Sequence, residues 1–219
     1  FLFEYAPYIL NVIIILSSFT SLFAASVGLV QNDIKKVIAY STCSQLGYMF
    51  VICGLSQYNI GLFHLVNHAV FKGLLFLSAG ALIHNIANEQ DLRKYGGMFN
   101  LLPVSLLALV TGSLALIGLP FLAGFYSKDL IIELTTVTFS LPSKIAFFYL
   151  NLTATLTTFY SIRTMYLVFL LKINTYKFIV QKIHETQPNI IYVLFLLSIC
   201  SVFCGYFLKD MFVGFGTDF

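Results

Sequence analysis

The chain has 219 residues, of which 59% are hydrophobic and only 10% are charged. A soluble domain carries roughly 25% charged residues, so this composition excludes a water-soluble globular protein. The net charge of +3 is too small to indicate a nucleic-acid partner. The sequence therefore predicts an integral membrane protein.

Long continuous apolar segments favour membrane helices over a membrane barrel. Barrel strands alternate in hydrophobicity over about 10 residues, whereas residues 8–30 read YILNVIIILSSFTSLFAASVGLV. A run of about 20 apolar residues is the length of one membrane-spanning helix. We expect an all-α integral membrane fold of about six transmembrane helices, over residues 7–31, 37–55, 60–84, 103–138, 145–172 and 189–212.

Lysine and arginine are distributed unevenly between the two sets of connectors. The connectors after the second, fourth and sixth spans hold only Lys144 and Lys209. By the positive-inside rule, the richer set faces the cytoplasm or the mitochondrial matrix, and the N-terminus begins on the opposite side. The basic residues of the richer set follow the first, third and fifth spans: Lys35, Lys36, Arg93, Lys94, Lys172, Lys177 and Lys182.

The fourth span, residues 103–138, is nearly twice as long as one membrane crossing requires. The segment GLPFLAG interrupts it at residues 118–124. Pro120 removes a backbone donor, and Gly118 and Gly124 loosen the chain, so we expect one discontinuous helix that breaks here. Discontinuous membrane helices often mark the ion path of a transporter.

Three titratable residues interrupt the apolar third span, in the stretch FHLVNHAVFKGLLF (63–76). Because residues four apart share a helix face, His64, His68 and Lys72 should form one stripe roughly 12 Å long. A charge near the middle of a membrane span costs roughly 2.5–3.5 kcal/mol. Such residues usually face a bundle interior and serve an ion or proton path.

Three interpretations of this stripe remain open. The residues are polar groups that hold helices together, ligands of a metal, or stations of a proton relay. The metal is disfavoured because HLVNH lacks the glutamate of the HExxH motif and Lys72 would repel a cation. The relay is favoured because histidine titrates near neutrality and a lysine in apolar surroundings releases its proton more readily than one in water.

Further polar residues lie near the stripe and the break. Lys128 and Asp129 follow the break directly, either as a local ion pair or as a proton site beside the broken helix. The segment YSTCSQ (40–45) offers hydroxyl and amide groups that either pack within the bundle or hold water beside the stripe. Arg163 is interpreted as the partner of a buried carboxylate or as a side chain that extends toward the basic side.

Four segments in this order resemble a known family: QNDIKKVIAYSTCSQLGYM (31–49), FHLVNHAVFKGLLFLSAGALIHN (63–85), NEQDLRKYGG (88–97) and GSLALIGLPFLAGFYSKD (112–129). They are similar to the antiporter-like membrane subunits of mitochondrial NADH:ubiquinone oxidoreductase, respiratory complex I, and to its chain 5 in particular. The same family includes the large subunits of Mrp-type cation/proton antiporters.

The resemblance implies a fold of two inverted five-helix repeats, each with one broken helix. Residues 1–172 would form the second repeat, with its discontinuous helix at about 103–138. Residues 173–188 would be a matrix-side connector, and residues 189–219 an additional transmembrane helix. The first repeat is missing from this sequence, so the chain is interpreted either as a fragment or as a split subunit completed by a separate polypeptide.

The resemblance also implies a role in proton translocation. The family's second-repeat proton path maps onto His64, His68, Lys72 and Lys128, with Asp129 adjacent. This chain would be a non-redox proton-pumping subunit, driven by redox chemistry in other subunits of the complex. An Mrp-type sodium/proton antiporter subunit is the second interpretation, and a structural scaffold of the membrane arm is the third.

Cofactors and partners follow from the same resemblance. No GxGxxG motif, cysteine cluster or extramembrane domain is present to bind NADH, flavin or an iron–sulfur cluster. We expect no cofactor in this chain, with FMN, iron–sulfur clusters and ubiquinone bound by other subunits. The expected partners are membrane-arm subunits of complex I, including a neighbouring antiporter-like subunit, and membrane lipid; the expected location is the mitochondrial inner membrane.

Overall fold

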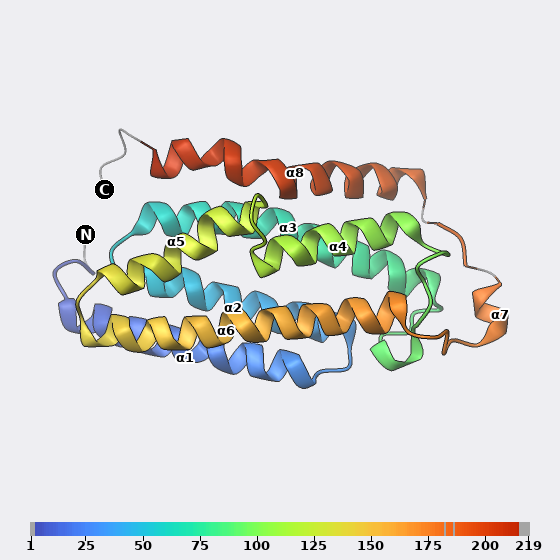
Figure 1. Ribbon diagram of the computed structural model, residues 1–219, viewed down its shortest axis with the longest axis horizontal. Helices are drawn as coiled ribbons and strands as arrows, with labels where there is room; N and C mark the ends of the chain where they lie inside the picture. Colours follow the sequence, from blue (N-terminus) through green and yellow to red (C-terminus); the bar gives the residue numbers. More distant parts are fainter. Residues whose placement is uncertain (1–2, 182, 186, 215–219) are drawn as a thin grey trace.

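The computed structural model describes residues 3–181, 183–185 and 187–214, and within them all regular elements are helices. The exception is one isolated β-bridge between Asp33 and Asp91. Figure 1 shows the helices running side by side as an elongated bundle. Their order is α1 (Pro7–Val30), α2 (Ile34–Gly54), α3 (Tyr58–Asn85), η1 (Leu92–Lys94), α4 (Pro103–Ile117), α5 (Ala123–Val137), α6 (Leu141–Met165), η2 (Tyr166–Leu170), α7 (Lys177–Val180) and α8 (Pro188–Val213).

Five continuous helices are long and apolar enough to cross a membrane: α1, α2, α3, α6 with its π-helical extension η2, and α8. The helices α4 and α5 have 15 residues each, about 22 Å at 1.5 Å per residue. Each is therefore shorter than the five continuous helices. The helices α4 and α5 follow one another along the bundle and together occupy about the length of one long helix (Figure 1). The predicted all-α membrane fold with one discontinuous helix is confirmed.

The interruption between α4 and α5 lies where the glycines and the proline predict it. Gly118 ends α4 in the left-handed conformation, with φ of 91°, and donates its N–H to the Leu114 carbonyl. A Cβ atom on Gly124 would lie 1.8 Å from the carbonyl oxygen of Ala115, so only glycine permits this close approach. The predicted segment 118–124 narrows to residues 118–122, because Gly124 already belongs to α5.

Two helix starts lie three or more residues earlier than predicted. The second span begins at Ile34 rather than at residue 37, and the fifth at Leu141 rather than at 145. In α6 the Ser140 side chain accepts a hydrogen bond from the Ser143 N–H and so caps the helix. Pro142 fits the first turn, where its missing N–H has no helical partner to lose. The residues taken as a connector are therefore the start of a capped helix.

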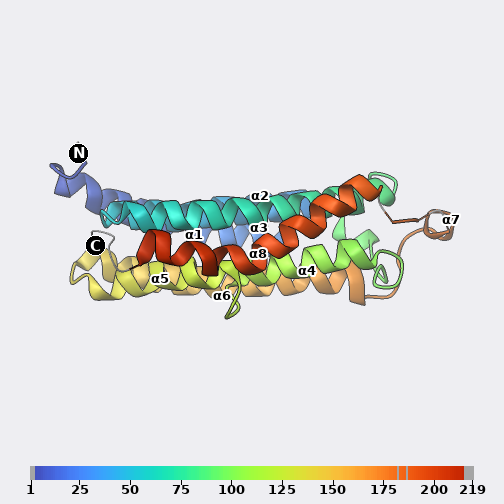
Figure 2. The same ribbon diagram turned by 90° about the horizontal axis from the view of Figure 1, so that it is seen from above.

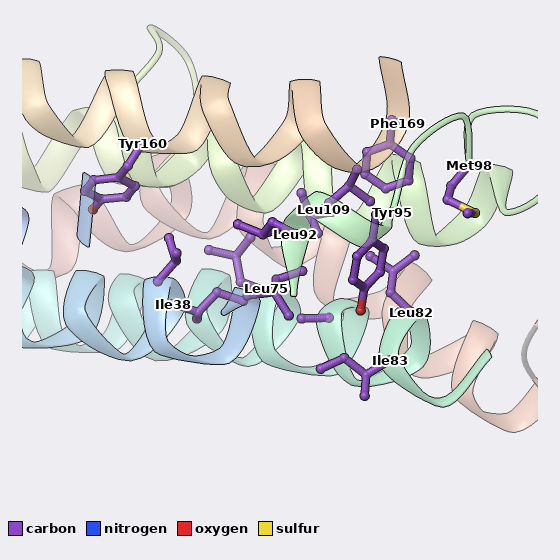
Figure 3. Close-up of a cluster of buried hydrophobic side chains, with 14 of the residues drawn as sticks. Ile38, Leu75, Leu82, Ile83, Leu92, Tyr95, Met98, Leu109, Tyr160 and Phe169 are labelled. Carbon is purple, nitrogen blue, oxygen red and sulfur yellow. The ribbon is translucent and has the colours of Figure 1, made fainter. Parts of the chain in front are cut away.

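Two helices, α1 and α3, make many of the contacts between helices. The helix α1 lies against α2 and α6, while α3 contacts α2, α4 and α8. Figure 2 shows α8 crossing the outside of the bundle over α3, α4 and α5. Figure 3 shows the main apolar cluster, in which Ile38, Leu75, Leu109 and Tyr160 join α2, α3, α4 and α6.

The connectors alternate between the two ends of the bundle. Those after α1, α3 and α6 lie at one end, and those after α2 and α5 lie at the other end with the N-terminus (Figure 1). The first group carries the predicted basic residues, so we call its end of the bundle the basic end. One of these residues, Lys182, lies outside the described residues. The assignment of residues 1–172 to a second repeat stays a prediction.

Arg163 links two helices at the basic end. Its guanidinium donates to the carbonyl oxygens of Leu29 at 2.9 Å and Gln31 at 2.6 Å, and to Asn32 Oδ1 at 2.7 Å. These carbonyls end α1, where a helix leaves acceptors without an internal partner. Arg163 therefore caps α1 and, among the residues that the structure describes, forms no ion pair with a carboxylate.

Candidate functional site

The helix α3 presents one buried stripe of titratable side chains. His64 is 0% exposed, Lys72 is 3% exposed and His68 is 7% exposed. The rings of His64 and His68 have their centroids 6.1 Å apart. The structure thus places all three residues on one inward face of α3, as the four-residue spacing predicts.

His64 connects α3 to two neighbouring helices. Its Nδ1 lies 2.8 Å from Ser127 Oγ on α5, and its Nε2 lies 3.2 Å from Gln45 Oε1 on α2. Because both ring nitrogens are already hydrogen-bonded, His64 has no free nitrogen with which to share a metal with His68. Within the described ranges, no group of three or more His, Cys, Asp or Glu residues could hold a metal ion.

The middle of the stripe contains buried polar atoms that no described residue satisfies. These atoms are His68 Nε2, both polar atoms of the Asn67 side chain and Gln45 Nε2. Buried polar groups in proteins are almost always satisfied by protein or by ordered water. The region between His68 and His64 is therefore suited to bind water.

Lys72 is held by α2. Its Nζ donates a short hydrogen bond to Ser41 Oγ and a long one, 3.5 Å, to the carbonyl oxygen of Ile38. Ser41 belongs to the segment YSTCSQ, and the structure brings its hydroxyl to the stripe. The neighbouring Thr42 instead donates to the Ala39 carbonyl of its own helix.

Lys128 caps the break. Its Nζ donates to the carbonyl oxygens of Ile117 at 3.2 Å and Leu116 at 3.5 Å, and to Thr157 Oγ1 at 3.1 Å. The side chain is 1% exposed, and the ammonium lies 5.6 Å from the centroid of the Tyr48 ring. The last carbonyls of α4 have no helical donors and carry the negative end of the helix dipole, so they stabilise a cation.

Asp129 does not pair with Lys128. The ion pairs of the described residues join Lys36 with Asp33, Arg93 with Asp91, and Lys94 with Glu89. Asp129 is partly exposed, and its Oδ1 lies near Gly118 at the break. The structure thus binds the Lys128 ammonium with uncharged acceptors, and the local ion pair considered from the sequence is not formed.

The site contains three residues that sequence reasoning missed. Ser127 joins His64 to the helix that carries Lys128, Thr157 accepts from Lys128, and Tyr48 covers the lysine. Tyr48 is itself fixed by hydrogen bonds of its hydroxyl to the Leu150 carbonyl at 2.7 Å and to Thr153 Oγ1. Only Ser127 had a sequence signal, its place beside Lys128 in FYSKD.

The charged side chains of the α3–α4 connector are exposed to solvent, whereas Lys72 and Lys128 are buried. The Lys94 ammonium lies 2.8 Å from Glu89 Oε2, and the Arg93 guanidinium binds both carboxylate oxygens of Asp91 at 3.1 Å. These hydrogen bonds hold the pKa of Glu89 and the pKa of Asp91 below their usual values. The connector is therefore an ion-paired surface at the basic end.

A family model for the NADH:quinone oxidoreductase/Mrp antiporter transmembrane region matches residues 1–158. The chain belongs to this family. The predicted resemblance to the antiporter-like subunits is confirmed, and the five long helices make the chain a multi-pass membrane protein.

Relatives within the family are similar over almost the whole chain. The NADH-ubiquinone oxidoreductase chain 5 of Acanthamoeba castellanii is 51% identical over 99% of this chain and 32% of its own length. That of Phytophthora infestans is 50% identical over 100% of this chain and 33% of its own length. The chain thus spans about a third of the length of the curated relatives it matches.

A solved structure shares the fold. It is the membrane-bound sulfane sulfur reductase, an archaeal respiratory membrane complex, at 25% identity and a TM-score of 0.77. The match covers 92% of this chain and 34% of the chain in that complex. The family fold therefore extends past the π-helical end of α6 into the last helix.

Proposed function

We propose that this chain forms part of a proton-translocating membrane-arm subunit of NADH:ubiquinone oxidoreductase in the mitochondrial inner membrane. The relatives named NADH-ubiquinone oxidoreductase chain 5 support the choice of complex. The single observation that carries the proton role is the buried hydrogen bond between His64 Nδ1 and Ser127 Oγ, one residue before Lys128. It joins the titratable stripe of α3 to the helix that carries the lysine at the break.

The proposed path begins at the basic end, which corresponds to the matrix. Lys72 takes up a proton and passes it through His68 to His64. The two rings are too far apart for a direct hydrogen bond, so a water beside the unpaired His68 Nε2 completes the step, and His64 Nε2 leaves Gln45 to bond that water. Ser127 then carries the proton from His64 onto the helix of Lys128, which takes it up and releases it toward the opposite face.

The energy for release comes from redox chemistry elsewhere in the complex. Moving one charge against 100 mV requires about 2.3 kcal/mol. A change of two pKa units in a buried group is worth about 2.7 kcal/mol. The acceptors around the Lys128 ammonium are uncharged, so they do not neutralise its charge. A change of charge near Lys128 is therefore sufficient to drive release.

The remaining assignments are part of the same proposal. The chain contributes no cofactor, and FMN, iron–sulfur clusters and ubiquinone are bound by other subunits. Residues 1–172 correspond to the second five-helix repeat, and a further polypeptide segment supplies the first. The partners are the other membrane-arm subunits, among them a neighbouring antiporter-like subunit.

An Mrp-type sodium/proton antiporter subunit is the alternative, since the family description includes Mrp antiporters. The purified assembly that contains this chain decides between them. Co-migration with NADH dehydrogenase activity supports the complex I role. Co-migration with a small cation-exchange assembly, without NADH oxidation, contradicts it.

The decisive variant is Lys128→Ala in the assembled complex, reconstituted into vesicles. We expect NADH oxidation to persist and the number of protons moved per NADH to fall, because the variant removes the lysine from the path. Lys144→Ala, an exposed lysine in the first turn of α6, is the control and should pump normally. A Lys128→Ala complex with the wild-type ratio would leave only a structural role for this site.

A further inference from the structure

A small internal cavity lies between the basic end and Lys72. It has a volume of about 20 Å³, and residues of α2, α3, α4 and α6 line it, most of them apolar. A cavity holds one water when it offers at least about 10–15 Å³ and several polar partners. Hydroxyl-bearing residues from three helices line it: Ser41, Ser113, Tyr160, Ser161 and Thr164.

Tyr160 brings an unsatisfied hydroxyl to this cavity. The side chain is 2% exposed, and its hydroxyl lies close to the Ser41 and Ser44 hydroxyls, but no hydrogen bond of normal geometry joins it to a described residue. Figure 3 shows Tyr160 projecting from α6 toward Ile38 of α2. A buried hydroxyl without a well-formed hydrogen bond is unfavourable, so a further partner is expected here.

The surrounding hydroxyls leave acceptor capacity for a water. Ser41 donates to the Ile38 carbonyl and accepts from Lys72, Ser113 donates to the Val110 carbonyl, and Thr164 donates to the Ser161 carbonyl. Each hydroxyl oxygen carries two lone pairs. A water that accepts from Tyr160 can therefore donate to two of these oxygens, so three of its four hydrogen-bonding directions find partners.

We propose that this cavity binds one water molecule that joins the Tyr160 hydroxyl to Ser41, and through Ser41 to Lys72. Tyr160 is then a positioning residue of the proton inlet, and the water is the last station before Lys72. This inference rests on the proposed proton role of the chain. It adds a bound-water site and a tyrosine that act on the side of Lys72 away from the histidines.

The position of the cavity fits an inlet. Ile34, the first residue of α2, and Thr164, close to the end of α6, line it at the basic end. Leu116 also lines it, and the carbonyl of that residue accepts from Lys128. The water would therefore lie next to residues that bind both buried lysines.

The test uses Tyr160→Phe in the assembled complex, with protons moved per NADH measured at pH 6.5 and pH 8.5. This variant keeps the ring and removes only the hydroxyl. We expect the ratio to fall at least twofold at pH 8.5 and less at pH 6.5, because proton supply limits uptake most where protons are scarce. Tyr149→Phe, a partly exposed tyrosine on the same helix, is the control and should leave the ratio unchanged at both pH values.

A second variant reaches the water without altering Tyr160. Ser113→Val fills the cavity with methyl groups and contacts neither lysine, so it should lower the ratio with the same pH dependence even if Tyr160→Phe fails to assemble. A density map of the wild-type complex should show one water within hydrogen-bond distance of Tyr160 and Ser41. A dry cavity, or either variant with the wild-type ratio at both pH values, overturns the inference.

The two proposals fail separately. If Lys128→Ala abolishes pumping while Tyr160→Phe and Ser113→Val pump normally, only the water site is wrong. If all three variants pump normally, the proton role of the chain is wrong.

Discussion

Ser127 is the only described side chain that hydrogen-bonds the α3 stripe directly to the helix carrying Lys128. Its hydroxyl lies 2.8 Å from His64 Nδ1, and its second contact, with the Gly124 carbonyl, is long at 3.5 Å. The hydrogen bond of Ser127 with His64 is therefore the shorter of its two hydrogen bonds. Ser44 and Ser41, by contrast, donate to backbone carbonyls three residues earlier.

We expect Ser127→Ala to slow proton transfer about fivefold, the equivalent of one hydrogen bond worth about 1 kcal/mol. NADH oxidation should continue, and the initial rate of vesicle acidification should fall. Ser201→Ala in α8 is the matched control, since this buried serine bonds only its own helix and should pump normally. An unchanged acidification rate in Ser127→Ala would show that His64 does not deliver protons through this hydroxyl.

The sequence identifies the titratable residues of the site better than their partners. His64, Lys72 and Lys128 are found because charged or polar side chains stand out in apolar spans. Thr157 does not stand out, because serine and threonine are frequent in membrane helices and usually bond their own backbone. Its role depends on the packing of α6 against the end of α4, which no local pattern records.

The element that organises the site is the pair of half-helices α4 and α5. Gly118 allows α4 to stop, and Gly124 allows α5 to start against α4. Pro120 lies in the non-helical segment 118–122. Its missing N–H therefore removes no hydrogen bond from either helix. The break was predictable, since proline and glycine act locally on the backbone.

We expect Gly124→Ala to destabilise the protein by about 1–3 kcal/mol, because the new methyl group meets the Ala115 carbonyl and the half-helices must move apart. Thermal unfolding in detergent or nanodiscs measures the change. Gly80→Ala in α3 is the control, because no atom lies within 4 Å of its would-be Cβ. Equal melting temperatures for the two variants would mean that the close contact at the break has no energetic role.

At the scale of the whole molecule, the two ends of the bundle differ in charge, and the ion-paired connector closes the basic end. Residues of this connector bond the start of α2 through the Ile34 N–H and the Gln90 carbonyl at 3.0 Å. Asn174 and Thr175, beyond α6, bond the carbonyls of Arg93 and Lys94. Sequence predicted which connectors share an end, since this follows from the number of spans. It did not predict these contacts, which join residues 56 apart at the start of α2 and 81 apart beyond α6.

We expect the connector to loosen in acid. The pKa values of Glu89 and Asp91 lie below the usual 4.5 and 3.8 in the folded state, so their pairs stabilise the connector above those values. This stabilisation is lost as the pH falls through the folded-state pKa values. Amide hydrogen exchange over residues 88–95, corrected for intrinsic rates, should show less protection at pH 3 than at pH 7. The double variant Glu89→Gln, Asp91→Asn should show the same low protection at both values, and a wild-type pH response in that variant would contradict this origin.

Lys128 as the cap of α4 has a consequence for hydration. The charged ammonium has three N–H donors, and the structure supplies three acceptors for them, two carbonyls and one hydroxyl. A neutral amine keeps only two N–H groups, so the loss of one proton would leave one of these three acceptors unsatisfied. A buried carbonyl in that state draws in a water molecule or shifts the helix end, and the degree of wetting of the break therefore follows the protonation of a single side chain.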